Sequence, residues 1–239
     1  MSEHTVKSFT DDLEALAATV AQMGGLCEAH FADAVEAIVK RDTARAESVI
    51  AGDVRIDALQ QQAEDQVLKI LARRQPLAVD LRETLAAIKC AGELERIGDM
   101  AKNLAKRAIV LNREPPIRLT QGLSRMGRQT LTQLKMVLDA YSDRDAPAAE
   151  TVWKQDGEID EMYNSLFREL LTYMMEDPRT IGLCTHLLFV AKNVERIGDH
   201  ATNIAEMVYY MVTGIHLDVD RPKADTTSEI RIEGKDAPQ

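Results

Sequence analysis

The chain contains two near copies of one stretch of fifteen residues, displaced by 100 positions. Residues 93–107 read ELERIGDMAKNLAKR, and residues 193–207 read NVERIGDHATNIAEM. Further upstream, residues 41–57 match residues 144–160 at a displacement of 103. Repetition of this kind indicates that one supersecondary unit is used twice. We therefore expect two tandem modules of about a hundred residues each.

Helical periodicity dominates both copies, because apolar residues recur at three- and four-residue spacing between widely placed prolines. The composition agrees, since 45% of residues are hydrophobic but only 4% are aromatic, a mixture that favours helix packing over strands. The sequence predicts an all-α protein of two tandem three-helix bundles. We predict helices near residues 6–40, 43–73, 78–112, 117–142, 147–176 and 180–213.

The predicted boundaries are residues 1–114 for the first module, 115–214 for the second and 215–239 for a flexible C-terminal tail. The tail turns charged and lies outside the repeated modules, so we expect its removal to matter little.

Charge and cysteine usage narrow the class of protein. A net charge of −10 argues against a nucleic-acid-binding surface, which needs a basic face. Cys27, Cys90 and Cys184 are far apart and form no CxxC pair, which favours buried free thiols in a reducing compartment. No run of eighteen apolar residues is present, and the N-terminus lacks the pattern of a signal peptide. We expect a cytoplasmic protein with no transmembrane segment.

Each repeat carries a polar row that falls opposite the apolar stripe of its helix, at about 100° per residue. In the helix near 78–112, the stripe includes Leu94, Ile97 and Leu104. The polar rows consist of Glu95, Asp99 and Asn103 in the first half and Glu195, Asp199 and Asn203 in the second. Carboxylates four residues apart share one helix face and repel each other unless a cation lies over them.

A second acidic pair precedes each row, namely Asp53 and Asp57 in the first half and Asp156 and Asp160 in the second. Asp53 lies 23 residues before Pro76 and Asp99 lies 23 residues after it. If the two helices form an antiparallel hairpin about Pro76, the pairs stand at one height, and the second half agrees within about one residue's rise. Oxygen ligands suit a hard cation or iron. The alternative is a solvated polar face in which Lys102 pairs with Asp99.

Other features of the sequence are weaker indications of a functional site. Gly98 and Gly198 sit within the repeated helices, which indicates either a close backbone approach or simple inheritance through the duplication. His200 follows Asp199 but points about 100° away from it, so we interpret it as a packing or surface residue. No Glu-x-x-His motif is present, which argues against a redox di-iron centre. We find no phosphate-binding loop and no nucleophile–base pair.

Several segments together resemble the PhoU family of bacterial phosphate-transport and phosphate-signalling regulators. They are ELERIGD, VERIGDHATNIAE, RRQP at 73–76, MGG at 23–25 and YMMEDPRTI at 173–181. The resemblance covers residues 9–213. It implies two similar three-helix bundles, no catalytic activity, and metal ions at the repeated acidic motifs, that is, at Glu95, Asp99, Glu195 and Asp199. Asn103, Asn203 and the four upstream aspartates are not implied by the resemblance. Their predicted positions on the helices make them further candidate ligands.

The resemblance also implies a function. Such proteins act as negative regulators of the phosphate-starvation response, linking the ATPase subunit of the phosphate ABC transporter to the sensor histidine kinase. A homodimer is expected. The metal stays open among iron, zinc, manganese and magnesium, since oxygen ligands accept all of them. Two alternatives remain: a phosphohydrolase using two cations, and a purely structural adaptor whose metal binding is incidental.

Overall fold

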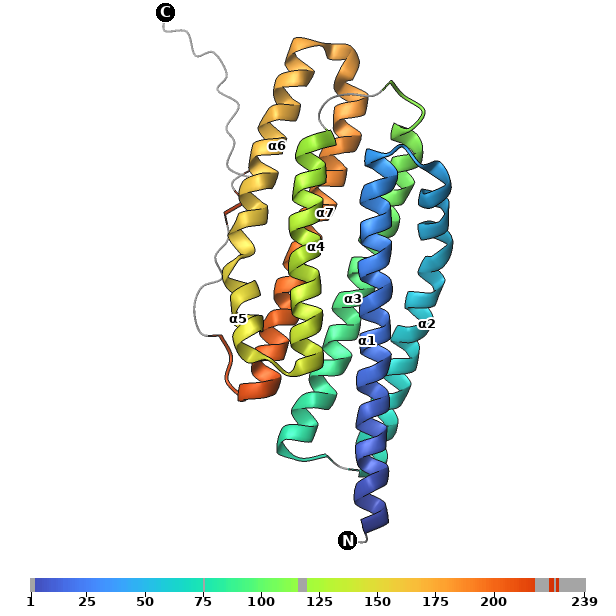
Figure 1. Ribbon diagram of the computed structural model, residues 1–239, viewed down its shortest axis with the longest axis vertical. Helices are drawn as coiled ribbons and strands as arrows, with labels where there is room; N and C mark the ends of the chain where they lie inside the picture. Colours follow the sequence, from blue (N-terminus) through green and yellow to red (C-terminus); the bar gives the residue numbers. More distant parts are fainter. Residues whose placement is uncertain (1–2, 75, 116–119, 218–223, 226, 228–239) are drawn as a thin grey trace, which may run out of the picture.

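The computed structural model is a set of long helices packed side by side (Figure 1). It describes residues 3–74, 76–115, 120–217, 224, 225 and 227. The first half holds α1 (Glu3–Val39), α2 (Thr43–Arg74) and α3 (Ala78–Leu111). The second half holds α4 (Thr120–Asp143), α5 (Ala146–Lys154), α6 (Asp156–Glu176), the short 3-10 helix η1 (Pro178–Thr180) and α7 (Ile181–Thr213). The described residues contain no strand, which confirms the all-α prediction.

The two central helices, α3 and α7, join the halves. Helix α3 packs on α1, α2 and α7, while α7 packs on α4, α5 and α6, and α1 also contacts α4. The two run in opposite directions: one cleft brings Val79 near Met211, and another brings Leu111 near Gly182. The bundles are therefore related by a pseudo-two-fold rather than by a translation, and α2 lies beside α3 as predicted (Figure 1).

The core follows the apolar stripes that the sequence predicts. Those of α3 and α7 are buried throughout, and their members are Leu94, Ile97, Ala101, Leu104, Ala108 and Leu111, with Val190, Val194, Ile197, Ala201, Ile204 and Val208. The three cysteines are free and buried, as predicted. Trp153 is also buried, and its indole N–H donates to Glu206 over 3.0 Å. Burial of apolar surface at this seam is the main force that holds the two halves together.

The helix predicted over 147–176 is wrong in one respect, because it is two helices that break at Gln155. The carbonyl of Gln155 accepts a 3.0 Å hydrogen bond from the side chain of Gln133 on α4, and Gly157, a poor helix former, follows. The equivalent pair in the first half is His30 and Gly52. There a Cβ on Gly52 would lie 2.6 Å from the His30 ring, so the glycine admits the ring and α2 continues unbroken.

The connections before α2 and α5 also repeat. Arg41 and Arg144 both adopt the left-handed conformation, with φ of 57° and 54°. Arg41 donates to the carbonyls of Asn112 and Glu114, over 2.7 and 2.6 Å, and so satisfies acceptors left unpaired beyond the end of α3. The predicted module boundaries at 114 and 214 stay predictions. The predicted flexible tail, 215–239, lies largely outside the described residues.

Candidate functional site

A glycine brings the two acidic helices of each half close together. A Cβ on Gly98 would lie 2.9 Å from Cδ1 of Ile56 on α2, and a Cβ on Gly198 would lie 2.7 Å from Cδ1 of Ile159 on α6. Both distances are shorter than real carbon contacts, so any larger residue at either position would have to push the isoleucine side chain aside. Each isoleucine directly precedes the second aspartate of its pair. Of the two interpretations that the sequence leaves open for these glycines, the close approach is therefore the one found in both halves, at the height of the acidic pairs.

The first acidic site consists of Asp53 and Asp57 on α2 with Glu95 and Asp99 on α3. Asp53 is buried, and its carboxylate accepts a hydrogen bond from the Lys102 ammonium, which also lies 3.8 Å from Asp99. Asp57 is exposed. The side chains of Glu95 and Asp99 are 21% and 46% exposed, so this site opens to solvent. Lys102 supplies the positive charge that such a group of carboxylates needs.

The four carboxylates act on one another electrostatically. Burial raises the pKa of Glu95, and the charges of Asp99, Asp57 and Asp53 raise this pKa further, against the opposing effect of Arg96. The pKa of Lys102 is also raised, first by its hydrogen bond to Asp53. The predicted meeting of the two acidic pairs at one level is therefore found in the first half.

The second acidic site consists of Asp156 and Asp160 on α6 with Glu195 and Asp199 on α7, and it is more enclosed. Asp156, Asp160 and Glu195 are each at most 5% exposed. Thr202 stands at the position equivalent to Lys102, and its hydroxyl donates to Asp156 over 2.8 Å. Burial raises the pKa of Asp160, as do the charges of Asp156 and Asp199.

The cation of the second site comes from Lys192, one turn before Glu195. Its ammonium lies 2.9 Å from Oε1 of Glu195 and 2.9 Å from Oδ2 of Asp225 in the C-terminal segment. Oε2 of Glu195 is buried and finds no hydrogen-bond partner among the described residues. Burial raises the pKa of Glu195 to about 7, and Asp199 and Asp160 add to this rise while Lys192 opposes it.

The two predicted asparagines have different surroundings. Asn103 is exposed. Asn203 lies at the α3–α7 seam, where its amide donates to Glu93 over 2.9 Å. The same Glu93 oxygen lies 2.6 Å from Nδ1 of His200. His200, predicted as a packing or surface residue, thus joins the two halves through a polar contact with Glu93.

The acidic residues offer the oxygen ligands that a hard cation prefers, but their side chains are not arranged around one point. Carboxylate oxygens and an unpartnered buried oxygen on Glu195 are what such an ion takes up. Within the described ranges, however, no three His, Cys, Asp or Glu side chains converge as metal ligands. Lys102 in one site and Lys192 in the other lie against the carboxylates. A metal ion would have to displace these ammonium groups.

Sequence reasoning missed two parts of the second site. Lys192 could have been found, since a lysine three residues before a glutamate on a helix forms an ion pair. The segment around Asp225 could not, because nothing in its sequence indicates where it docks. Backbone N–H groups of Ala224 and Asp225 donate to Oδ2 of Asp160 over 2.7 and 3.1 Å.

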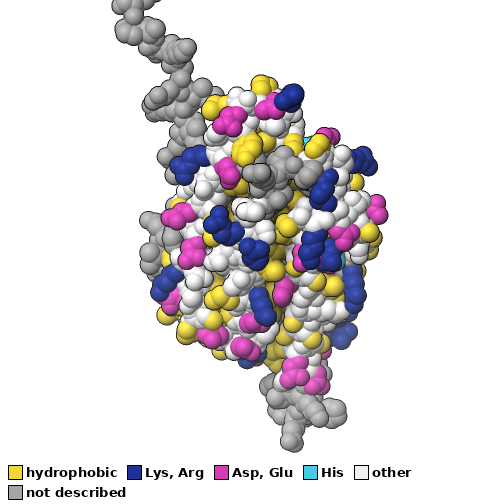
Figure 2. All heavy atoms as spheres, turned by 45° about the horizontal axis from the view of Figure 1, so that its top comes forward, with side chains coloured by type: hydrophobic (Ala, Val, Ile, Leu, Met, Phe, Trp, Pro, Cys, Tyr) yellow, Lys and Arg dark blue, Asp and Glu magenta, His cyan; other side chains and the backbone are white. Residues whose placement is uncertain are grey.

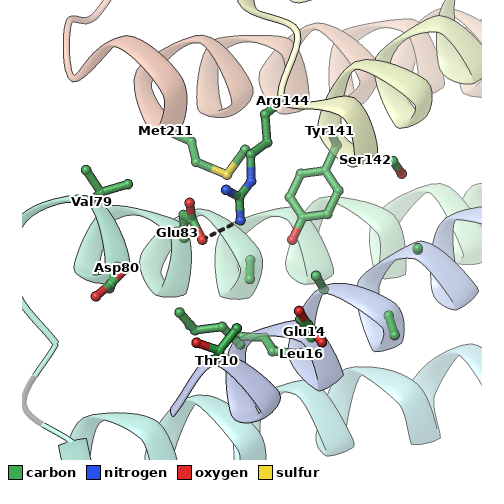
Figure 3. A pocket seen from close by; sticks show the side chains of 15 residues that line it. Thr10, Glu14, Leu16, Val79, Asp80, Glu83, Tyr141, Ser142, Arg144 and Met211 are labelled. Carbon is green, nitrogen blue, oxygen red and sulfur yellow. Dashed lines mark hydrogen bonds and ion pairs between the residues drawn. The ribbon is translucent and has the colours of Figure 1, made fainter. Parts of the chain in front are cut away.

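A cleft of about 640 Å³ lies between the halves, lined by α1, α3, the end of α4 and α7. Figure 3 shows Arg144 reaching from the turn after α4 toward Glu83, with 2.9 Å between them and Tyr141 alongside. Glu14 and Asp80 also line this cleft. Because the guanidinium is already paired with Glu83, the cleft is not a ready site for a free anion such as phosphate.

The outer surface carries both signs of charge. On the face drawn in Figure 2, basic and acidic side chains are interspersed with apolar ones rather than gathered into one block. None of the described helices is both long and apolar enough to cross a membrane.

Comparison with known proteins agrees with this architecture. The model of the PhoU domain matches twice, over residues 20–108 and 123–208. A phosphate-specific transport system accessory protein PhoU homolog of Caulobacter vibrioides is 54% identical over 230 residues, which are 96% of this chain and all of that protein. The homolog of Rhizobium meliloti is 49% identical over 228 residues, 95% of this chain and 96% of that one.

Solved structures agree as well. The crystal structure of PhoU from Pseudomonas aeruginosa superposes with a TM-score of 0.85 at 39% identity, covering 87% of this chain and all of that one. The phosphate transport system regulatory protein PhoU from Streptococcus pneumoniae gives 0.80 at 27% identity, covering 88% and 100%. Two matched domains, relatives of nearly equal length and the shared arrangement of helices lead to one conclusion: the chain belongs to the PhoU family.

Proposed function

We propose that this protein is a non-enzymatic negative regulator of phosphate uptake and of the phosphate-starvation response. The observation that carries the proposal is its similarity, over nearly the full length, to proteins named accessory proteins of the phosphate-specific transport system. In this proposal it links the ATPase subunit of the phosphate ABC transporter to the sensor histidine kinase. Long helices with a face on which both signs of charge mix with apolar side chains suit an adaptor.

A deletion strain tests the regulatory role. In phosphate-rich medium we expect the phosphate-starvation genes to be expressed without the protein and to be repressed when the full chain is restored. A reporter gene under a phosphate-controlled promoter measures this. Normal repression in the deletion strain would contradict the proposal. Co-purification of the tagged full chain with the ATPase subunit or the kinase, and the mass of the purified protein in solution, test the partners and the homodimer.

We also propose that both acidic sites bind metal ions. The first site would use Glu95 and Asp99 with Asp53 and Asp57, and the second would use the four equivalent carboxylates. Asn103 and Asn203 stay weaker candidates, since Asn203 bonds Glu93 in the seam. A bound cation would neutralise the crowded carboxylates. Two features support the proposal: the repulsion among these carboxylates and the unpartnered oxygen of Glu195.

Metal analysis of matched variants tests the two sites separately. We expect Glu95→Ala/Asp99→Ala to lose about half of the bound metal, and Glu195→Ala/Asp199→Ala to lose the other half. Because a ligand that binds only the folded state stabilises it, saturation at a hundred times Kd should add about 2.7 kcal/mol to the free energy of unfolding. Chelation should remove this gain and leave the fold intact. Wild-type protein that binds no metal under any condition would show that the acidic rows are only polar surface.

Catalysis is the remaining alternative, and a direct assay decides it. Metal-loaded protein should release no phosphate from phosphomonoesters at a rate above that of a variant that combines Glu95→Ala/Asp99→Ala with Glu195→Ala/Asp199→Ala. A metal-dependent rate that the combined variant lacks would replace the adaptor with a phosphohydrolase.

A further inference from the structure

Two described residues near the C-terminus, Ala224 and Asp225, lie against the second acidic site. Oδ2 of Asp160 accepts hydrogen bonds from two consecutive backbone N–H groups, those of Ala224 and Asp225. The carbonyl of Ala224 in turn accepts a 2.6 Å bond from the side chain of Asn164, one turn further along α6. Side chains on one face of α6 therefore bind both the N–H groups and the carbonyl of this stretch of backbone.

The side chains of Asp225 and Thr227 make a second set of contacts. Oδ2 of Asp225 lies 2.9 Å from the ammonium of Lys192. Oδ1 of Asp225 accepts from the backbone N–H and the hydroxyl of Thr227, over 2.9 and 2.7 Å. Tyr163 hydrogen-bonds Thr227 as well. Contacts from α6 and α7 therefore converge on three residues that lie beyond the end of α7 in the sequence.

These contacts use the groups that a cation at this site would need. A carboxylate oxygen has two lone pairs, and the two backbone N–H groups occupy both lone pairs of Asp160 Oδ2. The ammonium of Lys192 bridges Asp225 and Glu195, so the segment holds a positive charge beside Glu195. When the segment is docked, Oδ2 of Asp160 is not available as a metal ligand. The positive charge of Lys192 also repels an incoming cation.

We propose that Ala224, Asp225 and Thr227, hereafter the segment, form an intramolecular ligand of the second acidic site that competes there with a metal cation. Release of the segment frees Asp160 and loosens the hold on Lys192, which opens the site. The competition rests on the proposed metal binding, whereas the docking of the segment does not.

The first half provides the internal contrast. Asp57, the equivalent of Asp160, is exposed. The first acidic site is therefore accessible, apart from the hold of Lys102. In this proposal the first site binds a metal ion without competition from the segment. The second site binds one only when the segment is released.

Hydrogen exchange of the metal-free full chain tests the docking. We compare wild type with Asn164→Ala/Lys192→Met, which alters only the receiving helices and leaves the sequence of the segment unchanged. The Ala224 and Asp225 amides should exchange about tenfold faster in the variant, because their hydrogen-bonded state is lost. Lys102→Met is the control in the first half and should leave them protected. Amides that exchange in wild type at the rate of an unstructured peptide overturn the docking.

Mn²⁺ titration tests the competition with changes made in the segment. Ala224→Pro/Asp225→Ala removes one N–H donor and the partner of Lys192. It is combined with Glu95→Ala/Asp99→Ala, which leaves only the second site, or with Glu195→Ala/Asp199→Ala, which leaves only the first. If the segment is docked about nine-tenths of the time, its substitution should tighten Mn²⁺ binding about tenfold at the second site. The first site should not change.

The outcomes separate the two ideas. Equal Mn²⁺ affinity at the second site with the native and the substituted segment overturns the competition and leaves metal binding standing. Equal tightening at both sites also overturns it, since the effect would not be local. A protein that takes up no Mn²⁺ in any of these forms refutes the proposed metal binding and the competition together, while the exchange measurement still decides the docking.

Discussion

The two acidic sites descend from one repeat, yet they balance the same four carboxylates in different ways. In the first, Lys102 of α3 lies against Asp53, and the site opens to solvent. In the second, Thr202 takes the place of Lys102 and donates to Asp156. The cation there is Lys192, and Asp160 accepts from the backbone of the C-terminal segment.

This difference shows which part of the site each half preserves. The carboxylates, the glycine that lets the helices approach and the isoleucine that packs on it occur in both halves. The compensating groups do not. Duplication thus kept an anionic site of one geometry, and each half then acquired its own source of positive charge. The enclosed second site holds the more strongly perturbed carboxylate, Glu195.

The largest expected effect is on the pH dependence of stability. Glu195 has a pKa of about 7 in the folded protein against 4.5 when unperturbed, so the folded state binds the extra proton between these values. This contribution to stability is present below pH 4.5 and is lost as the pH rises through 7. Glu195→Gln should therefore match wild type at low pH and exceed its free energy of unfolding above pH 7, by up to about 3 kcal/mol.

Urea unfolding from pH 4 to 8, with chelator present, measures this difference between Glu195→Gln and wild type. Glu95→Gln is the matched control in the first half, and its effect should be smaller because Glu95 is 21% exposed. A difference that does not vary with pH, or an equal one in both halves, would mean that burial does not separate the two sites.

The next effect should be shared by the halves and so tests what they have in common. Gly98→Val and Gly198→Val place a branched side chain against Ile56 and Ile159, where even a Cβ would lie within 2.9 Å. Each should lower the free energy of unfolding by about 2 kcal/mol, as overpacked cores do. Gly25→Val is the control, since a Cβ at Gly25 meets no atom within 4 Å. Similar losses at all three glycines would contradict a close approach at the acidic sites.

The shared part of the sites is also the part that the sequence predicted. Periodicity located the helices, and equal distances from Pro76 placed Asp53 opposite Asp99, because rise per residue is constant along a helix. Electrostatic coupling of Glu95 with all three partners agrees with that placement. The break at Gln155 was not predictable, since it depends on a side chain of another helix, Gln133.

The differing part of the sites could be predicted only in fragments. Helical spacing offers Lys102 as a partner of Asp99, but its closer contact is with Asp53 on the neighbouring helix. Helical spacing places Asn203 with the carboxylates, yet residues four apart on a helix turn about 40° further round the axis at each step. That drift, continued over two steps, turns the amide toward Glu93 in the seam.

A smaller effect compares the two compensating groups directly. Lys102→Met leaves the buried Asp53 carboxylate without its ammonium, and Thr202→Val leaves Asp156 without the hydroxyl donor. Each should lower the free energy of unfolding by about 1–2 kcal/mol at pH 7. Saturating Mn²⁺ should restore more of this loss in Lys102→Met, where a metal ion takes the place of the missing charge. Equal restoration in both variants would show that Lys102 and a metal ion do not share one position.

The smallest effect concerns the segment that only the second half uses. Asp225→Ala removes a partly exposed ion pair with Lys192, whose side chain is 39% exposed, so the loss in free energy of unfolding should be about 0.5–1 kcal/mol. Glu150→Ala, which breaks the exposed pair with Lys154, is the control and should lose less. The sequence alone predicts no effect from removing the tail, because it lies outside the repeats. An Asp225→Ala loss no larger than that of the control would support that expectation. A clearly larger loss in Asp225→Ala would instead show that Asp225 contributes to the second site. Thermal unfolding of both variants beside wild type measures the two losses.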